Sequence, residues 1–293
     1  MGGASAICTD KTGTLTTNRM EVKDIILGSD FAGAHAAAVE AAATAVSANK
    51  SIRDTLALDK VRALPAAARS ALITNTVLNL GSDTTVGVNM EKSAQTLVWN
   101  YGGNKTECGL LRFATELSAL DATTASSTIT KAAITKVCGA DAKDGAWVND
   151  VVKDVRGGNK IPYAKGNKFN YPDGAKLFPF NSEKKKMTIV VKWDDATYRV
   201  ITKGGPDVLL GKTAGAESCC CSKLDVGDGT TVAFADHAEA ILAQIPVLQS
   251  KGLRTLCIAY KDFTEAELRS LAAEHAAAAA AADDDGGDES ARP

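Results

Sequence analysis

The side chains best suited to chemistry lie near the start of the chain, where Asp10 follows the short apolar run Ser5–Cys8. A carboxylate at the tip of a strand can attack a phosphorus atom as a nucleophile. The turn after it contains Gly13 and several threonines, whose N–H groups and hydroxyls can hold phosphoryl oxygens, while Lys11 offsets negative charge. The sequence therefore predicts a phosphoryl-transfer centre formed by Asp10, Lys11 and Thr12.

The composition excludes several other classes of protein. With 33 basic and 35 acidic residues, the chain lacks the excess positive charge of a nucleic-acid-binding protein. Its seven cysteines include the consecutive Cys219–Cys221 and no C-x-x-C pair, which favours reduced thiols over a disulfide scaffold or a zinc site. The sequence shows neither a signal-peptide pattern nor a run of about 18 apolar residues. We therefore expect the isolated chain to be soluble and to bind no nucleic acid.

Hydrophobic periodicity predicts the elements that must position this chemistry. Two β-rich runs on either side of Asp194–Thr197 predict a hairpin, and Thr264 and Glu267 predict a capping box before a final helix. The other expected elements are strands at Ser5–Cys8 and Val22–Leu27, a buried strand at Thr255–Tyr260, and helices at 31–47, 66–80, 106–117 and 237–248. Residues 139–174 are expected to form an irregular surface loop and residues 283–293 a disordered tail.

The segment ICTDKTGTLTTNRM resembles the phosphorylation motif of the P-type ATPases, and Thr17–Met20 resembles the calcium-pump version. The resemblance implies that Asp10 receives phosphate from Mg-ATP and that Asp10 and Thr12 help to hold the magnesium ion. In related aspartate phosphatases of the haloacid dehalogenase fold, a second aspartate stands at the position of Thr12 and acts as general acid and base. With threonine there, we expect a longer-lived phosphoenzyme, which suits a pump.

Four later segments resemble the nucleotide-binding domain of the same family and follow the family's order. They are NKTEC from Asn104, FNSEKKKM from Phe180, KGGPD from Lys203 and GLRTLCIAY from Gly252. By this resemblance Glu107 contacts the adenine amino group, Phe180 stacks on adenine, and Lys203 lies deep in the adenine pocket. Lys185 lines the pocket, Arg254 approaches the phosphates and Leu256 packs near the base. The implied cofactor-binding set is therefore Glu107, Phe180, Lys185, Lys203, Arg254 and Leu256.

Each of these residues also has a simpler interpretation. An aromatic face can stack on a base for about 1–3 kcal/mol, and Lys or Arg can supply charge for phosphates. However, Phe180 alone could be a core aromatic, and Lys184–Lys186 a solvated charged face. Glu107 could be a surface acid on a helix, and Lys203 could begin a Gly-Pro turn. The order of the segments after the phosphorylation motif favours the nucleotide site.

The resemblance covers residues 5 to about 263 and implies an α/β fold. We expect a nucleotide-binding domain at residues 28–265, a twisted and mostly antiparallel sheet flanked by helices. It would be inserted into a haloacid-dehalogenase-like phosphorylation domain whose first part is residues 1–27, while residues 266–293 would form an Ala-rich helix and an acidic tail. The family's later DPxR, TGD and GDGxND segments do not follow. We therefore expect this phosphorylation domain to be incomplete and its first 20 residues to be poorly anchored.

The function implied by the resemblance is that of the cytoplasmic catalytic portion of a plasma-membrane-type (type IIB) calcium-transporting ATPase. ATP and Mg2+ would be its cofactors, and Ca2+ would be the cargo of the full-length pump. Transmembrane helices outside this chain would hold it at the cytoplasmic face of a membrane, and calmodulin-type regulators would be partners of the parent protein. Two alternatives remain open: a P-type pump for another cargo, and a nucleotide-binding fragment without turnover. KGGPD in place of the commoner KGAPE is a mild departure that keeps the lysine.

Overall fold

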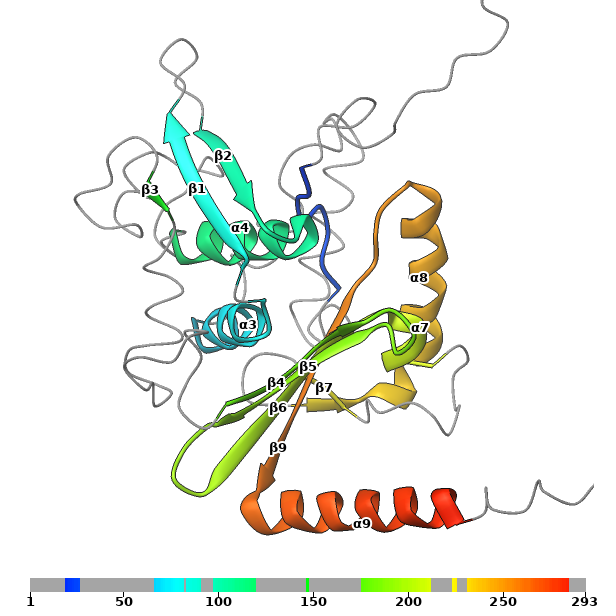
Figure 1. The fold of residues 1–293 in the computed structure, drawn as a ribbon. Helices are drawn as coiled ribbons and strands as arrows, with labels where there is room; N and C mark the ends of the chain where they lie inside the picture. Colours follow the sequence, from blue (N-terminus) through cyan, green and yellow to red (C-terminus); the bar gives the residue numbers. More distant parts are fainter. Residues whose placement is uncertain are drawn as a thin grey trace, which may run out of the picture.

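The computed structural model describes residues 19–26, 66–81, 83–90, 97–119, 146–147, 175–211, 223–225 and 231–284. In this part of the chain, helices combine with antiparallel strands (Figure 1). The α/β class with antiparallel pairing is therefore confirmed. The expected strand Ser5–Cys8, the expected helix 31–47, the phosphorylation motif and the last nine residues lie outside the described residues.

Among the described residues, the largest sheet has four strands in the order β4-β5-β6-β9, and every neighbouring pair is antiparallel. The strands are β4 (Lys176–Asn181), β5 (Lys186–Lys192), β6 (Thr197–Gly204) and β9 (Cys257–Thr264). The β5–β6 pair is the hairpin predicted from the sequence. Its turn is fixed by Asp194, whose Oδ1 accepts hydrogen bonds from the N–H groups of Ala196 at 2.9 Å and Thr197 at 2.7 Å.

Strand β9 corrects one expectation, because it is an edge strand and not a buried one. Its residues are half-buried or exposed, since among the described strands only β6 pairs with it. Arg199 of β6 holds this edge through a two-pronged ion pair with Asp262, with both N···O distances at 2.6 Å. The guanidinium also lies 3.6 Å from the ring centre of Trp193 and 4.3 Å from that of Tyr260.

The other described strands form two smaller antiparallel sheets, so the strands that the structure describes are divided among three sheets. The three-stranded sheet has the order β2-β1-β3, with β1 at Thr85–Met90, β2 at Leu97–Gly102 and β3 at Ala146–Trp147. The two-stranded sheet joins β7 (Lys223–Asp225) to β8 (Thr231–Ala233). The expectation of irregular loop through 139–174 is wrong at β3. Strand β3 has only two residues and pairs with β1 on the side away from β2, so it is too short to show an alternating sequence pattern.

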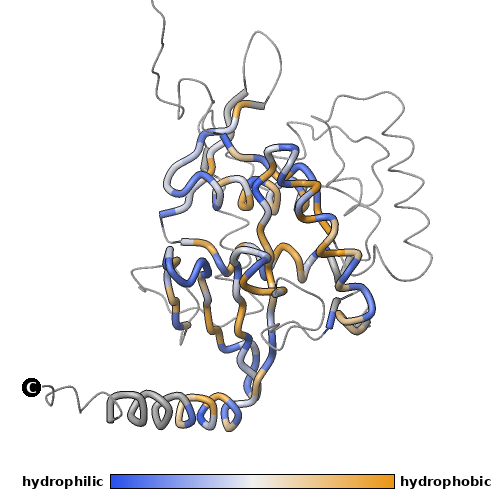
Figure 2. Tube along the Cα trace, turned by 90° about the vertical axis from the view of Figure 1, so that its right-hand side faces the viewer, coloured by the Kyte–Doolittle hydropathy of each residue, from blue (hydrophilic) through white to orange (hydrophobic). Residues whose placement is uncertain are grey.

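The helices largely follow the predicted periodicity. Those in the described part of the chain are α3 (Ala66–Leu78), α4 (Lys105–Ala119), the short α7 (Pro206–Leu209), α8 (Ala238–Ser250) and α9 (Glu265–Asp284), with a 3-10 turn, η3, at Phe234–Asp236. The predicted capping box is confirmed at the start of α9. The N–H of Thr264 donates to Glu267 Oε2 at 2.7 Å, and the N–H of Glu267 donates to Thr264 Oγ1 at 3.3 Å. Helix α9 projects away from the rest of the described chain (Figure 2).

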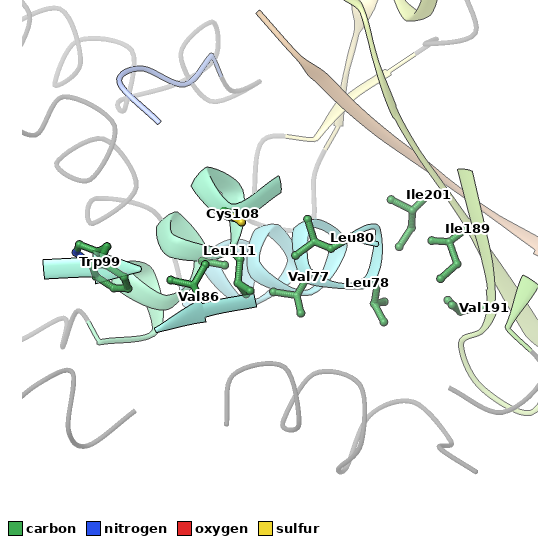
Figure 3. Packing of buried hydrophobic residues seen from close by; sticks show 11 residues of the cluster. Val77, Leu78, Leu80, Val86, Trp99, Cys108, Leu111, Ile189, Val191 and Ile201 are labelled. Carbon is green, nitrogen blue, oxygen red and sulfur yellow. The ribbon is translucent and has the colours of Figure 1, made fainter. Parts of the chain in front are cut away.

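One apolar core joins the two larger sheets (Figure 3). Helices α3 and α4 pack together, and their apolar faces meet the three-stranded sheet on one side and β5 and β6 on the other. Each fully buried aliphatic side chain stabilises such a core by about 1.5–3 kcal/mol. The cluster consists of Val77, Leu78, Leu80, Val86, Trp99, Cys108, Leu111, Ala114, Ile189, Val191 and Ile201.

Residues 19–26, here called the N-terminal strap, correct a second expectation. The predicted strand from Val22 is absent in the described residues 19–26, which have no regular secondary structure. The strap is held instead by side chains of the three-stranded sheet and α4. Tyr101 Oη donates to the carbonyl of Met20 at 2.9 Å, and Arg112 pairs with Glu21. Gly109 allows the close approach, because a Cβ there would lie 2.8 Å from the Met20 carbonyl oxygen.

Candidate functional site

The chain topology brings most of the predicted site residues to one end of the four-stranded sheet. Because neighbouring strands run in opposite directions, the end of β4, the start of β5, the end of β6 and the start of β9 meet there (Figure 1). Lys203 pairs in register with Met187 on one side and Ile258 on the other. Phe180 and Lys185 flank the β4–β5 turn, and Arg254 and Leu256 lie just before β9.

Glu107 and Lys203 form a buried ion pair at this end. Their side chains are only 8% and 7% exposed, although one comes from the first turn of α4 and the other from β6. The second carboxylate oxygen of Glu107 accepts a hydrogen bond from the N–H of Gly81 at 2.7 Å and one from Thr84 Oγ1 at 2.5 Å. Glu107 is therefore not a surface acid, and Lys203 is part of a strand and not the start of a turn.

The ionisation of Glu107 follows from these contacts. Burial raises the pKa of its carboxyl group, but the positive charge of Lys203 and the hydrogen bonds from Lys203, Thr84 and Gly81 lower it by more. The net pKa of Glu107 is below its ordinary value, so the carboxylate is charged at neutral pH. The site thus holds a buried anion and a buried cation that satisfy each other.

Asn79 completes this buried arrangement and was missed in the sequence analysis. Its backbone carbonyl accepts a hydrogen bond from Lys203 Nζ, and its side-chain Nδ2 donates to the Ile201 carbonyl at 3.2 Å. Its Oδ1 is buried and has no hydrogen-bond partner among the described atoms. The signal in the sequence was an asparagine between the apolar Leu78 and Leu80, where the helical pattern calls for burial.

Two apolar side chains at the same end of the sheet as the pair are exposed. Phe180 is 59% exposed on β4, and Leu256 is 36% exposed. The core-aromatic interpretation of Phe180 is therefore wrong, because a side chain this open to solvent adds little to a core. The neighbouring run Lys184–Lys186 is exposed, as a solvated charged face would be. An exposed phenylalanine at the same end of the sheet as the ion pair is suited to stack on a flat ligand.

The two remaining predicted cations each contact a residue of the chain itself. Lys185 Nζ lies 3.6 Å from Asp207 Oδ2, with both side chains largely exposed. Arg254 Nη1 donates to Thr106 Oγ1 at 2.8 Å, which ties the start of β9 to the first turn of α4. The N-cap of that helix is Asn104, whose Oδ1 accepts from the N–H groups of Thr106 at 3.0 Å and Glu107 at 3.3 Å.

Asp10, Lys11 and Thr12 lie outside the described residues, so the structure does not place them relative to this end of the sheet. Within the described ranges, no group of three or more His, Cys, Asp or Glu side chains could hold a metal ion. In the same part of the chain no helix is both long and apolar enough to cross a membrane.

Comparison with known proteins decides the family. The sequence model of the family described as P-type ATPase, cytoplasmic domain N, matches residues 70–285, which is most of the chain. The chain belongs to the P-type ATPases. The matched range includes every residue of the N domain site described above, from Asn79 to Leu256, and leaves the strap outside it.

Individual relatives point to one branch of the P-type ATPases. The N domain and its flanks are 28% identical over 269 residues to plasma membrane calcium-transporting ATPase 1 of Gallus gallus, covering 91% of this chain and 16% of the relative. The human protein of that name is 27% identical over the same length, with the same two coverages. Human plasma membrane calcium-transporting ATPase 4 is 28% identical over 269 residues. The chain thus spans about a sixth of the length of these relatives.

Proposed function

We propose that this chain is the ATP-binding part of a calcium pump and that its N domain binds Mg-ATP at the end of the four-stranded sheet. The proposal rests on one observation above all: an exposed aromatic, Phe180, lies at the same end of the sheet as the buried pair Glu107–Lys203. A flat, apolar ring with polar edges fits this combination. The adenine would stack on Phe180, with Leu256 beside it and its amino group toward Glu107.

The hydrogen-bonding capacity of the site supports an adenine amino group as the ligand. A carboxylate has about four acceptor positions. Three are used by Lys203, Gly81 and Thr84, which leaves Glu107 with room for one further donor. Glu107 therefore offers one acceptor position to a ligand that brings an N–H group.

The phosphates would be bound by the cations at the rim. Lys185 and Arg254 are exposed and positively charged, and they lie on the turn before β5 and on the segment before β9, at the same end of the sheet as Phe180. Arginine can bind phosphate with two parallel hydrogen bonds, whereas lysine acts as a compact charge. Mg2+ would accompany the phosphates, with Asp10 and Thr12 as the residues of this chain that would contact it.

In the full-length parent, we propose that Asp10 accepts the phosphoryl group with Lys11 offsetting its charge, and that the phosphoenzyme drives Ca2+ across a membrane from its cytoplasmic face. The names of the relatives support this cargo, because all three compared above are calcium-transporting ATPases of the plasma membrane. The isolated chain would bind nucleotide without completing the transport cycle, and calmodulin-type regulators would act on the parent.

Truncating Lys203 would leave Glu107 buried without its partner and could unfold the domain, so the proposed nucleotide site is better tested at the exposed Phe180. Mg-ATP binding should be measured by calorimetry on the unmutated chain, on Phe180→Ala and on Phe178→Ala. Phe178 is a matched control, because it is 50% exposed on the same strand but lies two residues, about 7 Å, farther from the end of the sheet. Both variants should fold as the unmutated chain does.

We expect Phe180→Ala to weaken Mg-ATP binding about 5- to 150-fold, the equivalent of about 1–3 kcal/mol of lost stacking. Phe178→Ala should change the dissociation constant less than twofold. If the unmutated chain shows no binding while its circular dichroism is that of a folded protein, the site does not bind ATP. Equal losses in the two variants would contradict a stacking position specific to Phe180.

A further inference from the structure

Asp207 is a second residue of the KGGPD segment with a contact at the site, and nothing above gives it a role. Its Oδ2 lies 3.6 Å from Lys185 Nζ, the closest carboxylate contact described for that lysine. The two residues come from different elements, the β4–β5 turn and the first turn of α7, so the pair is a tertiary contact. Both side chains are accessible to ligand, at 59% and 45% exposure.

The backbone on both sides of this pair is fixed. Lys185 has a φ of 47°, the only positive φ of a non-glycine residue in the described part of the chain. Its carbonyl accepts from the N–H of Gly205 at 3.2 Å, and a Cβ at Gly204 would lie 2.6 Å from the same oxygen. Asn181 Oδ1 fixes the turn by accepting from the N–H groups of Glu183 and Lys184. Lys185 therefore leaves the turn in a set direction, with the Asp207 carboxylate nearby.

A carboxylate and a phosphate compete for the same ammonium group. Asp207 Oδ2 lies 3.6 Å from Lys185 Nζ, so a polyphosphate bound by this lysine would lie close to the carboxylate, and the two anions would repel each other. Resting on the proposed function, we propose that Asp207 is a positioning residue that holds Lys185 as its counterion and weakens polyphosphate binding until the ligand displaces it. A ligand without phosphates does not meet this competition.

Gly205 contributes to the same arrangement. A Cβ at this position would lie 2.4 Å from Asp207 Oδ1, although the φ of −61° and ψ of 138° at Gly205 suit any residue. Gly205→Ala therefore keeps the charge of Asp207 but forces the carboxylate to move. This variant therefore tests whether the position of the Asp207 carboxylate matters when its charge is kept.

The test is calorimetric titration of the full chain with Mg-ATP and, separately, with adenosine. The variants are Asp207→Asn, Asp207→Glu, Gly205→Ala, Lys185→Met and the double variant Asp207→Asn/Lys185→Met. Exposed ion pairs shift an equilibrium by about two- to fivefold at low salt. We expect Asp207→Asn to tighten Mg-ATP binding by that factor and to leave adenosine binding unchanged. Asp207→Glu should restore the weaker binding, and Gly205→Ala should tighten it by a smaller factor.

The gain from Asp207→Asn should fall by at least half when Lys185 is already methionine, and it should shrink in high salt because exposed charges are screened. An equal gain in both backgrounds would overturn the proposal, since Asp207 would then act by repulsion through space and not through Lys185. Unchanged or weaker Mg-ATP binding by Asp207→Asn would also overturn it. If the unmutated chain binds neither ligand, the proposed function fails as well, which distinguishes that failure from the failure of this inference.

Discussion

Replacing Glu107 with glutamine is the perturbation whose consequence the structure defines most closely. The substitution keeps the shape of the side chain and removes its charge. It leaves Lys203, with 7% of its side chain exposed, without the carboxylate of Glu107, while the hydrogen bond from Lys203 Nζ to the Asn79 carbonyl remains. The new amide must also place its NH2 group toward either Lys203 or the donors Gly81 and Thr84, so at least one donor faces another donor.

The expected loss follows from these contacts. Breaking a buried ion pair by removing one partner destabilises a protein by about 3–5 kcal/mol, because the other charge stays buried. The free energy of unfolding of a natural domain is about 5–15 kcal/mol. We therefore expect Glu107→Gln to lose about 3–5 kcal/mol, a large part of the free energy of unfolding.

Urea unfolding followed by circular dichroism measures this loss, with the slope checked for a two-state transition. The matched control is Glu265→Gln, which removes the charge of the exposed pair Glu265–Arg269 on α9 and should not shift the midpoint measurably. Adding Lys203→Met to Glu107→Gln should recover part of the loss, because the buried positive charge is then gone. Two results would contradict a stabilising ion pair between Glu107 and Lys203. One is a loss under about 1 kcal/mol in Glu107→Gln, and the other is a double variant with a lower free energy of unfolding than Glu107→Gln.

Two further predictions concern acid and the last helix. Because the pKa of Glu107 is lowered in the folded chain, its stabilising contribution is complete above the ordinary value of 4.5 and is lost as the pH falls through the lower folded value. The difference in unfolding midpoint between the unmutated chain and Glu107→Gln should therefore shrink as the pH is lowered below about 4.5, and a constant difference would contradict the assignment. Thr264→Ala should remove the capping box of α9 and reduce the far-ultraviolet helix signal by about one turn, with Mg-ATP affinity unchanged. An undiminished helix signal would show that α9 does not depend on its cap.

Local sequence patterns were enough to predict the elements whose fixing contacts join residues close together in the sequence. The β5–β6 hairpin alternates apolar residues around a turn with Asp194, and α9 has Thr264 and Glu267 at the spacing of a capping box. Both involve contacts between residues close in the sequence. The family resemblance then named Glu107 and Lys203, and the structure brings these two together.

Features that depend on distant partners could not be predicted in the same way. The stretch around Tyr260 is apolar enough for a buried strand, yet β9 lies at the edge because no further described strand pairs with it. Val22 begins a β-rich run, but the strap makes its contacts with the side chains of Tyr101 and Arg112. The pair formed by Lys185 and Asp207 depends on how α7 follows β6, which no local pattern reveals.

The contact between α4 and Met20 lowers the local stability of α4, because it requires a glycine at position 109. A glycine inside a helix is about 1 kcal/mol less favourable than alanine, and α4 contains this glycine in its second turn. Alanine would make α4 a better helix in isolation, but its methyl group would collide with the backbone of Met20. Local and tertiary preferences therefore oppose each other at this position. A substitution chosen to improve the helix alone would loosen the chain around it.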